Sequence, residues 1–178
     1  MNNIKFKLIV MNFLQFAVWG SHLTSMGGYL FAAGYGELIG WFYAMQGVVS
    51  MFMPAIMGII ADKWIPAQRL LGLCHGIAAL FIAGAGYCGQ NDMLWPMFTL
   101  YSLSVAFYMP TLALSNSVAY TSLEQGGFDT VKAFPPIRVF GTIGFIVAML
   151  VCDFAGFQAS PAQFFQCAFI GILLSLYA

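Results

Sequence analysis

Long stretches without a single charged residue constrain this chain more than any other feature. Asp, Glu, Lys and Arg are all absent from residues 8–36, 38–61, 70–91 and 93–123. Each stretch is longer than the roughly 20 apolar residues that a helix needs to cross a bilayer. Charged residues form only 7% of the whole chain, whereas soluble domains contain about 25%. The sequence therefore predicts a membrane protein, with lipid rather than water as its main solvent.

The remaining third of the chain continues this pattern. After Arg138 only Asp153 interrupts the apolar sequence, and the turn-like residues 156–161 divide it into two segments. Strands of a membrane barrel need about 9–11 residues of alternating polarity, and these stretches are longer and apolar throughout. A cleaved N-terminal signal is disfavoured because the first run is too long and no small-residue cleavage site follows it. We predict an all-α membrane protein with six transmembrane helices at about 8–32, 38–61, 70–89, 93–121, 136–157 and 162–178.

The basic residues predict the orientation of these helices. With six spans, the segments before helix one, between helices two and three, and between helices four and five lie on one side. All six cations fall there: Lys5, Lys7, Lys63, Arg69, Lys132 and Arg138. The opposite connections, around Glu37, Asp92 and Asp153, contain none. Because Lys and Arg favour the cytoplasmic side, the N-terminus is predicted to be cytoplasmic.

Several other functions are disfavoured by composition. The formal net charge is zero, which argues against a nucleic-acid partner. HExxH, GxSxG and Cys-pair motifs are missing from the sequence, so no enzyme, cofactor or metal site is expected. The four cysteines lie in or at the ends of the apolar helices and are expected to be small packing residues: Cys74, Cys88, Cys152 and Cys167.

Some helices are nevertheless unusually polar. The first contains Gln15, Trp19 and His22, and the fourth contains Asn116. Polar side chains in membrane helices usually face the bundle interior or a watered cavity. They could bond helices to each other, at about 1 kcal/mol per contact, or line a cavity for a polar solute. The cavity interpretation is favoured, and the interhelical one stays open.

The connection between the second and third helices carries a recognisable pattern. Gly58 is followed by Asp62, Lys63 and, after Pro66, by Arg69. This segment resembles the signature loop of the major facilitator superfamily, in which the acidic residue steadies one conformational state at the cytoplasmic face. The resemblance implies a conformational gate made of Asp62, Lys63 and Arg69. Pro66 and the late second cation depart from the usual pattern, and an ordinary solvated helix end is the alternative.

Within that superfamily the sequence resembles the nucleoside:proton symporter family. The matching blocks are FLQF at 13–16, WGS at 19–21, FMPA at 52–55, ADKW at 61–64, YMPTL at 108–112, FPPIR at 134–138 and GTIGF at 141–145. They occur in order along nearly the whole chain. The resemblance implies proton-coupled nucleoside symport by alternating access across a bacterial inner membrane. It also implies twelve helices in two halves, so the chain is expected to be an N-terminal half whose partner is the missing C-terminal half of the same transporter.

The same resemblance assigns candidate substrate-binding residues. Arg138, Thr142 and Phe145 match family positions that bind substrate, and their spacing places them on one helical face. Gln15, Trp19 and Asn116 are added as cavity candidates from their positions alone. A carrier of another polar solute, such as a sugar, is the alternative function, and a helical bundle with a purely structural or partner-binding role is a further one.

The proton-coupling group is not evident in this chain. All six acidic residues lie near helix ends, so the coupling carboxylates are expected in the C-terminal half. His22, placed within the first helix, is a local alternative for the titrating group. A structural histidine with a satisfied hydrogen bond is the favoured interpretation of that residue.

Overall fold

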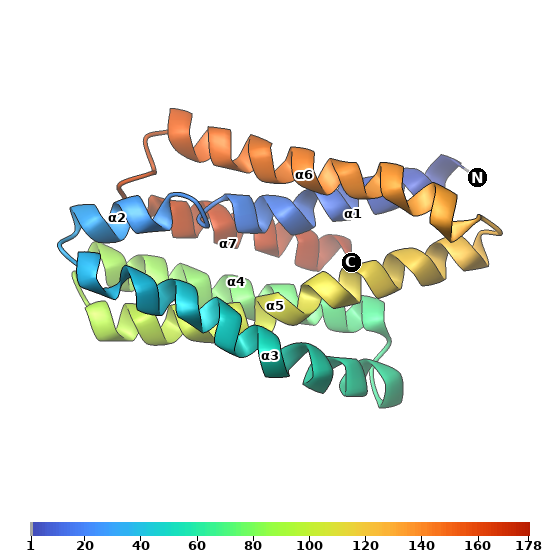
Figure 1. Cartoon of the computed structure of the whole chain (residues 1–178), viewed down its shortest axis with the longest axis horizontal. Coiled ribbons are helices and arrows are strands. Elements are labelled where there is room, and N and C mark those ends of the chain that lie inside the picture. Colours follow the sequence, from blue (N-terminus) through green and yellow to red (C-terminus); the bar gives the residue numbers. More distant parts are fainter. Residues whose placement is uncertain (1) are drawn as a thin grey trace.

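The computed structural model describes residues 2–178 and contains only helices within that range (Figure 1). The elements are α1 (Asn2–Gly20), α2 (Met26–Ala32), a short 3-10 helix η1 (Gly36–Leu38), α3 (Ile39–Lys63), α4 (Ala67–Gln90), α5 (Leu94–Gln125), α6 (Thr130–Phe154) and α7 (Ala162–Tyr177). The predicted all-α fold class is confirmed.

The long helices run side by side along one axis. Packing proceeds from α6 to α1, from α1 to α7, from α7 to α4, from α4 to α5 and from α5 to α3 (Figure 1). The helices α3 and α6 therefore form two edges of the bundle, while α1, α4, α5 and α7 supply most of its interior. Exposed apolar side chains are frequent on both edge helices, as expected where lipid or another apolar surface replaces water.

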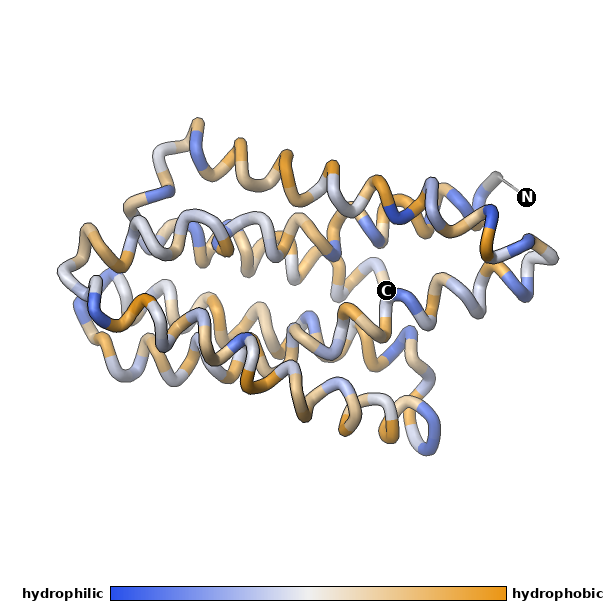
Figure 2. The backbone as a smooth tube through the Cα atoms, in the orientation of Figure 1, coloured by the Kyte–Doolittle hydropathy of each residue, from blue (hydrophilic) through white to orange (hydrophobic). Residues whose placement is uncertain are grey.

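The hydropathy of the helices fits a membrane. Four segments are long and apolar enough to cross a bilayer: Gly36–Lys63, Ala67–Gln90, Leu94–Gln125 and Thr130–Phe154. Helix α7 is a shorter apolar helix. The first predicted span, 8–32, corresponds to α1 and α2 together. Figure 2 shows hydrophilic positions gathered mainly at the two ends of the bundle, with a few inside.

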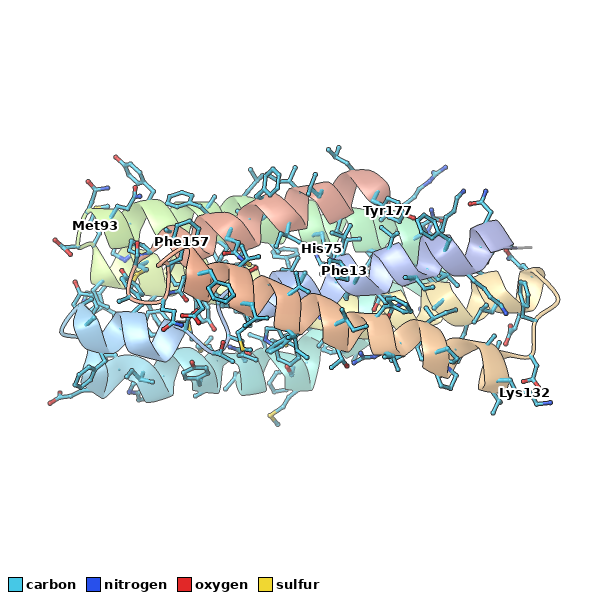
Figure 3. The ribbon with its side chains drawn as sticks, turned by 90° about the horizontal axis from the view of Figure 1, so that it is seen from above. Phe13, His75, Met93, Lys132, Phe157 and Tyr177 are labelled. Carbon is cyan, nitrogen blue, oxygen red and sulfur yellow. The ribbon has the colours of Figure 1, made fainter. Side chains whose placement is uncertain are left out.

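The tertiary structure groups the basic segments at one end. The start of α1, the α3–α4 connection and the α5–α6 connection lie at the same end of the bundle in Figure 1. In Figure 3, Lys132 marks this end, while Met93 and Phe157 lie at the opposite end. The segments predicted to share the cytoplasmic side therefore lie at the same end of the bundle. We call the end with Lys132 the basic end and the other the acidic end.

The first predicted helix, 8–32, is interrupted. Residues 21–25 form turns between α1 and α2, whereas the sequence favoured one continuous span. Hydroxyl side chains compete for backbone groups here, since Ser21 Oγ donates to the carbonyl of Ala17 at 2.8 Å. The carbonyl of Leu23 accepts from Tyr43 Oη at 2.7 Å, so a side chain of α3 stabilises the interruption.

The fifth predicted helix, 136–157, also differs in the structure, where α6 runs from Thr130 to Phe154. Asp129 caps its N-terminus, because a carboxylate oxygen accepts from the amides of Val131 and Lys132 at 3.1 and 3.4 Å. Pro135 and Pro136, at the predicted start of this helix, therefore lie inside it. The cap sets the boundary, and it is a weaker sequence signal than a proline pair.

Glycines allow two pairs of helices to approach closely. A Cβ atom at Gly20 would overlap the carbonyl of Phe145, and one at Gly144 would overlap the carbonyl of Phe13, which joins α1 to α6. On α4, a Cβ at Gly72 would lie 3.0 Å from the carbonyl oxygen of Ser175 on α7. Small residues at helix interfaces are typical of membrane bundles. The α1–α6 contact positions the residues described next.

Candidate functional site

Helix α6 presents a polar row beside its contact with α1. Its buried row packs inward and consists of Ile137, Gly141, Gly144, Ala148 and Cys152. Arg138, Thr142 and Phe145 each follow one of these residues directly, which rotates them by about 100° around the helix. Arg138 and Phe145 are half-buried and Thr142 is exposed, whereas most other exposed side chains of α6 are large and apolar. The row of Arg138, Thr142 and Phe145 is thus a chemically distinct face, and the structure keeps these three predicted residues together.

Arg138 stacks on an aromatic ring of α1. Its guanidinium carbon lies 3.8 Å from the ring centroid of Phe16, a cation–π arrangement. A Cβ at Gly141 would lie 2.6 Å from the Phe16 ring and 2.8 Å from a guanidinium nitrogen of Arg138, so this glycine makes the stack possible. The one ion pair among residues 3–178 joins Lys132 to Asp129. Within that range the donors of Arg138 remain free to bind an acceptor.

Phe145 and Trp19 extend the aromatic surface toward the centre of the bundle. Their rings meet edge to face with centroids 6.3 Å apart, and the Trp19 ring lies 6.3 Å from that of Tyr108. Trp19 Nε1 donates to Gln46 Oε1 on α3 at 3.2 Å, and Gln46 Nε2 donates to Tyr101 Oη at 2.8 Å. Contacts with α3, α5 and α6 therefore fix the indole ring.

Thr142 and Asn116 are placed to offer polar groups. Thr142 is exposed on α6, and Asn116 is half-buried on α5. Neither side chain hydrogen-bonds to another described residue. Gln15, in contrast, bonds to two other side chains. Both groups can therefore bind a polar ligand without first breaking a bond within this part of the chain.

Gln15 lies in a different environment from the other candidates. It is fully buried, and its Nε2 donates to Thr111 Oγ1 while its Oε1 lies 2.8 Å from His75 Nε2. Tyr108 Oη also donates to the backbone carbonyl of Gln15 at 2.8 Å. These bonds join α1 to α4 and α5, which is the interhelical role that the sequence left open.

His75, Tyr108 and Gln46 were not singled out as functional residues from the sequence. Each lies within an apolar helix and is buried. Their polarity inside spans was the available signal, because such groups need partners in lipid. Their hydrogen-bond partners depend on how the helices cross, which the sequence alone does not predict.

The three gate candidates lie beside the α3–α4 connection at the basic end. Asp62 and Lys63 belong to the last turn of α3, and Arg69 belongs to the first turn of α4. All three side chains are exposed. An acid near a helix C-terminus and a cation near an N-terminus oppose the helix dipoles, each by about 0.3–1 kcal/mol at a surface. Asp62 and Arg69 are therefore placed where an external partner of opposite charge would stabilise them.

The described residues contain no group of three or more His, Cys, Asp and Glu side chains arranged to hold a metal ion. Each of the four cysteines is free and buried within the bundle. The candidate face of α6 offers a guanidinium, a hydroxyl and an aromatic ring, next to the indole of Trp19. Such groups bind a polar ligand that carries both hydrogen-bonding atoms and a flat ring.

An all-helical bundle with long apolar helices and apolar outer surfaces defines a multi-pass membrane protein. The chain belongs to the nucleoside H+ symporter family, whose model matches residues 1–178. The members to which it is similar are transporters rather than enzymes. The family expected from the sequence is thereby confirmed.

Individual relatives agree with this assignment. The chain is 43% identical over 178 residues to the xanthosine permease of Escherichia coli (strain K12), covering 99% of this chain and 42% of the permease. It is 40% identical over 177 residues to the nucleoside permease NupG of the same organism, covering 98% of this chain and 42% of NupG. The chain thus spans less than half the length of these curated relatives.

A solved structure shows the same architecture. The crystal structure of the nucleoside transporter NupG superposes with a TM-score of 0.90 at 40% identity, covering 98% of this chain and 43% of that one. The match falls on its N-terminal half, which confirms the predicted fold class.

Proposed function

We propose that this chain forms the N-terminal half of a carrier that moves nucleosides into the cell together with protons, by alternating access. Membership of the nucleoside H+ symporter family and the names of the two permeases support this proposal. The single observation that carries it is the polar row of α6, in which an unpaired guanidinium, a hydroxyl and an aromatic ring share one face next to Trp19.

The chemistry of a nucleoside matches this row. Ribose hydroxyls and base carbonyls accept hydrogen bonds, which Arg138 can donate through its fork of N–H groups. Thr142 can donate to or accept from the ribose, and Phe145 offers a ring edge or face to the base. Trp19 and Asn116 complete this wall from α1 and α5. Gln15 has a positioning role, because its bonds to His75 and Thr111 hold α1 against α4 and α5.

A second wall and the titrating group are expected from the C-terminal half of the same transporter, which is the proposed partner. Asp62, Lys63 and Arg69 form the proposed gate, where Asp62 meets a cation of that half in one end state. This contact would relieve the unfavourable placement of Asp62 at a helix C-terminus. The lipid bilayer of a bacterial inner membrane, with the basic end in the cytoplasm, completes the proposal.

Transport measurements on the whole carrier test this function. Proteoliposomes with an imposed proton gradient should accumulate radiolabelled uridine, and an excess of other nucleosides should compete where sugars do not. Collapse of the gradient with an uncoupler should abolish accumulation but leave binding intact. Competition by sugars alone would assign the carrier to another solute, and accumulation without a gradient would exclude proton coupling.

A further inference from the structure

The distinct face of α6 continues toward the acidic end of the bundle. Met149 and Asp153 each directly follow a residue of the buried row, as the three residues of the polar row do. Because an α-helix rises about 1.5 Å per residue, Asp153 lies about 12 Å beyond Phe145 and about 22 Å beyond Arg138. The face therefore ends in a carboxylate that a nucleoside held by Arg138 does not reach.

A pocket of about 310 Å³ lies at this end of the face, near Phe157 in Figure 3. Its walls are α6, the turn between α1 and α2, and the α6–α7 connection, and its polar residues are Thr24, Ser25, Asp153 and Gln158. Ser25 Oγ lies 3.5 Å from Cys152 Sγ, so the turn packs directly against α6 here. Small-molecule sites have volumes of about 300–1,000 Å³, and this pocket falls at the lower end of that range.

Two polar groups of this pocket are open to a ligand. The side chains of Asp153 and Thr24 are both exposed. Oδ1 of Asp153 accepts a hydrogen bond from Gln158 Nε2, whereas no described residue bonds to its Oδ2 or to the hydroxyl of Thr24. Asp153 also lies in the last turn of α6, where the helix dipole adds no compensating positive charge. The pocket therefore offers a free carboxylate oxygen and a free hydroxyl.

The charge of the pocket restricts the ligands that it can bind. Asp153 is the single charged residue in its lining, so an anionic ligand is repelled. A calcium ion takes about six to eight oxygen ligands, often from several carboxylates, and one carboxylate does not supply them. A carboxylate accepts strong hydrogen bonds from hydroxyl groups. The pocket thus suits a neutral ligand that carries adjacent hydroxyls, as the ribose of a nucleoside does.

We propose that this pocket is an outer docking site, where the ribose of a nucleoside binds before the nucleoside reaches Arg138. The inference rests on the proposed function, whose topology places the acidic end outside the cell, and it adds a second substrate site. Oδ2 of Asp153 accepts from one ribose hydroxyl, and the hydroxyl of Thr24 bonds to the adjacent one. Met149 offers the base a flexible apolar surface between this site and Phe145.

Initial rates of uptake by the whole carrier test the docking site. Asp153→Asn keeps the shape of the side chain and removes the charge that strengthens its bond to ribose. The KM for uridine should rise by about threefold to tenfold, while the maximal rate should stay the same because the polar row is unaltered. The KM for 2′,3′-dideoxyuridine, which lacks both ribose hydroxyls, should not change. Asp92→Asn is the matched control: it removes a carboxylate from the same end but outside the pocket, and Asn tolerates the positive φ of 53° there.

The possible results separate this inference from the proposed function. An unchanged uridine KM in Asp153→Asn, or an equal rise for both solutes, would overturn the docking site and leave the proposed function intact. A similar rise in Asp92→Asn would assign the effect to the charge of the whole end and would also overturn the site. Thr24→Val removes the other free hydroxyl at nearly constant shape and should raise the uridine KM in the same way; it decides the question if Asp153→Asn does not reach the membrane. Absence of uridine uptake by the unsubstituted carrier would instead refute the proposed function, and this inference with it.

Discussion

Replacement of Arg138 by Lys separates substrate binding from a role in topology. Lys keeps the positive charge that orients the helix, but it lacks the planar fork that donates two parallel hydrogen bonds. The guanidinium carbon of Arg138 lies 3.8 Å from the Phe16 centroid, so its plane is fixed before substrate arrives. Loss of one charge-assisted hydrogen bond costs about 1.5–3 kcal/mol, or roughly tenfold to more than a hundredfold in affinity.

Calorimetry on the purified whole carrier measures this loss directly. The Arg138→Lys protein should insert and purify normally, yet bind nucleoside with a dissociation constant raised by about tenfold or more. Lys132→Arg is the matched control, because it makes the reverse exchange of cations at the basic end and Lys132 belongs to neither the α6 row nor the proposed gate. Its dissociation constant should not change. An unchanged constant for Arg138→Lys would leave this residue as a topology determinant alone.

Three further predictions address packing, the buried network and orientation. Gly144→Ala should lower the melting temperature strongly, because its Cβ would overlap a backbone carbonyl of α1, whereas Gly47→Ala has open space and should not; equal melting temperatures would contradict the close α1–α6 contact. Gln15→Leu should destabilise the bundle by about 1–3 kcal/mol for each buried partner left unbonded, measured by chemical unfolding in detergent; unaltered stability would show that the network contributes nothing. In intact cells, an impermeant thiol reagent should label Asn91→Cys and spare Gln68→Cys; the reverse pattern would invert the topology.

Much of the fold is predictable because its signals are local. A charge-free stretch of sufficient length becomes a helix in lipid whatever its neighbours do, since unbonded backbone groups cost several kcal/mol there. Four predicted spans accordingly correspond to α3, α4, α5 and α6, although Asp129 moves the start of α6. Boundaries are less predictable because caps and side-chain bonds decide them, as Tyr43 does at the interruption of the first span.

In the candidate site too, local spacing predicts some features and helix packing decides others. Arg138, Thr142 and Phe145 share a face because their spacing alone imposes it, and the sequence therefore determined that row. Whether Gln15 faces a cavity or another helix was undetermined, because the answer requires the crossing of α1 with α4 and α5. The tertiary structure brings it against His75 and Thr111. Periodicity fixes which residues share a face of one helix, but only the packing of several helices decides what each face meets.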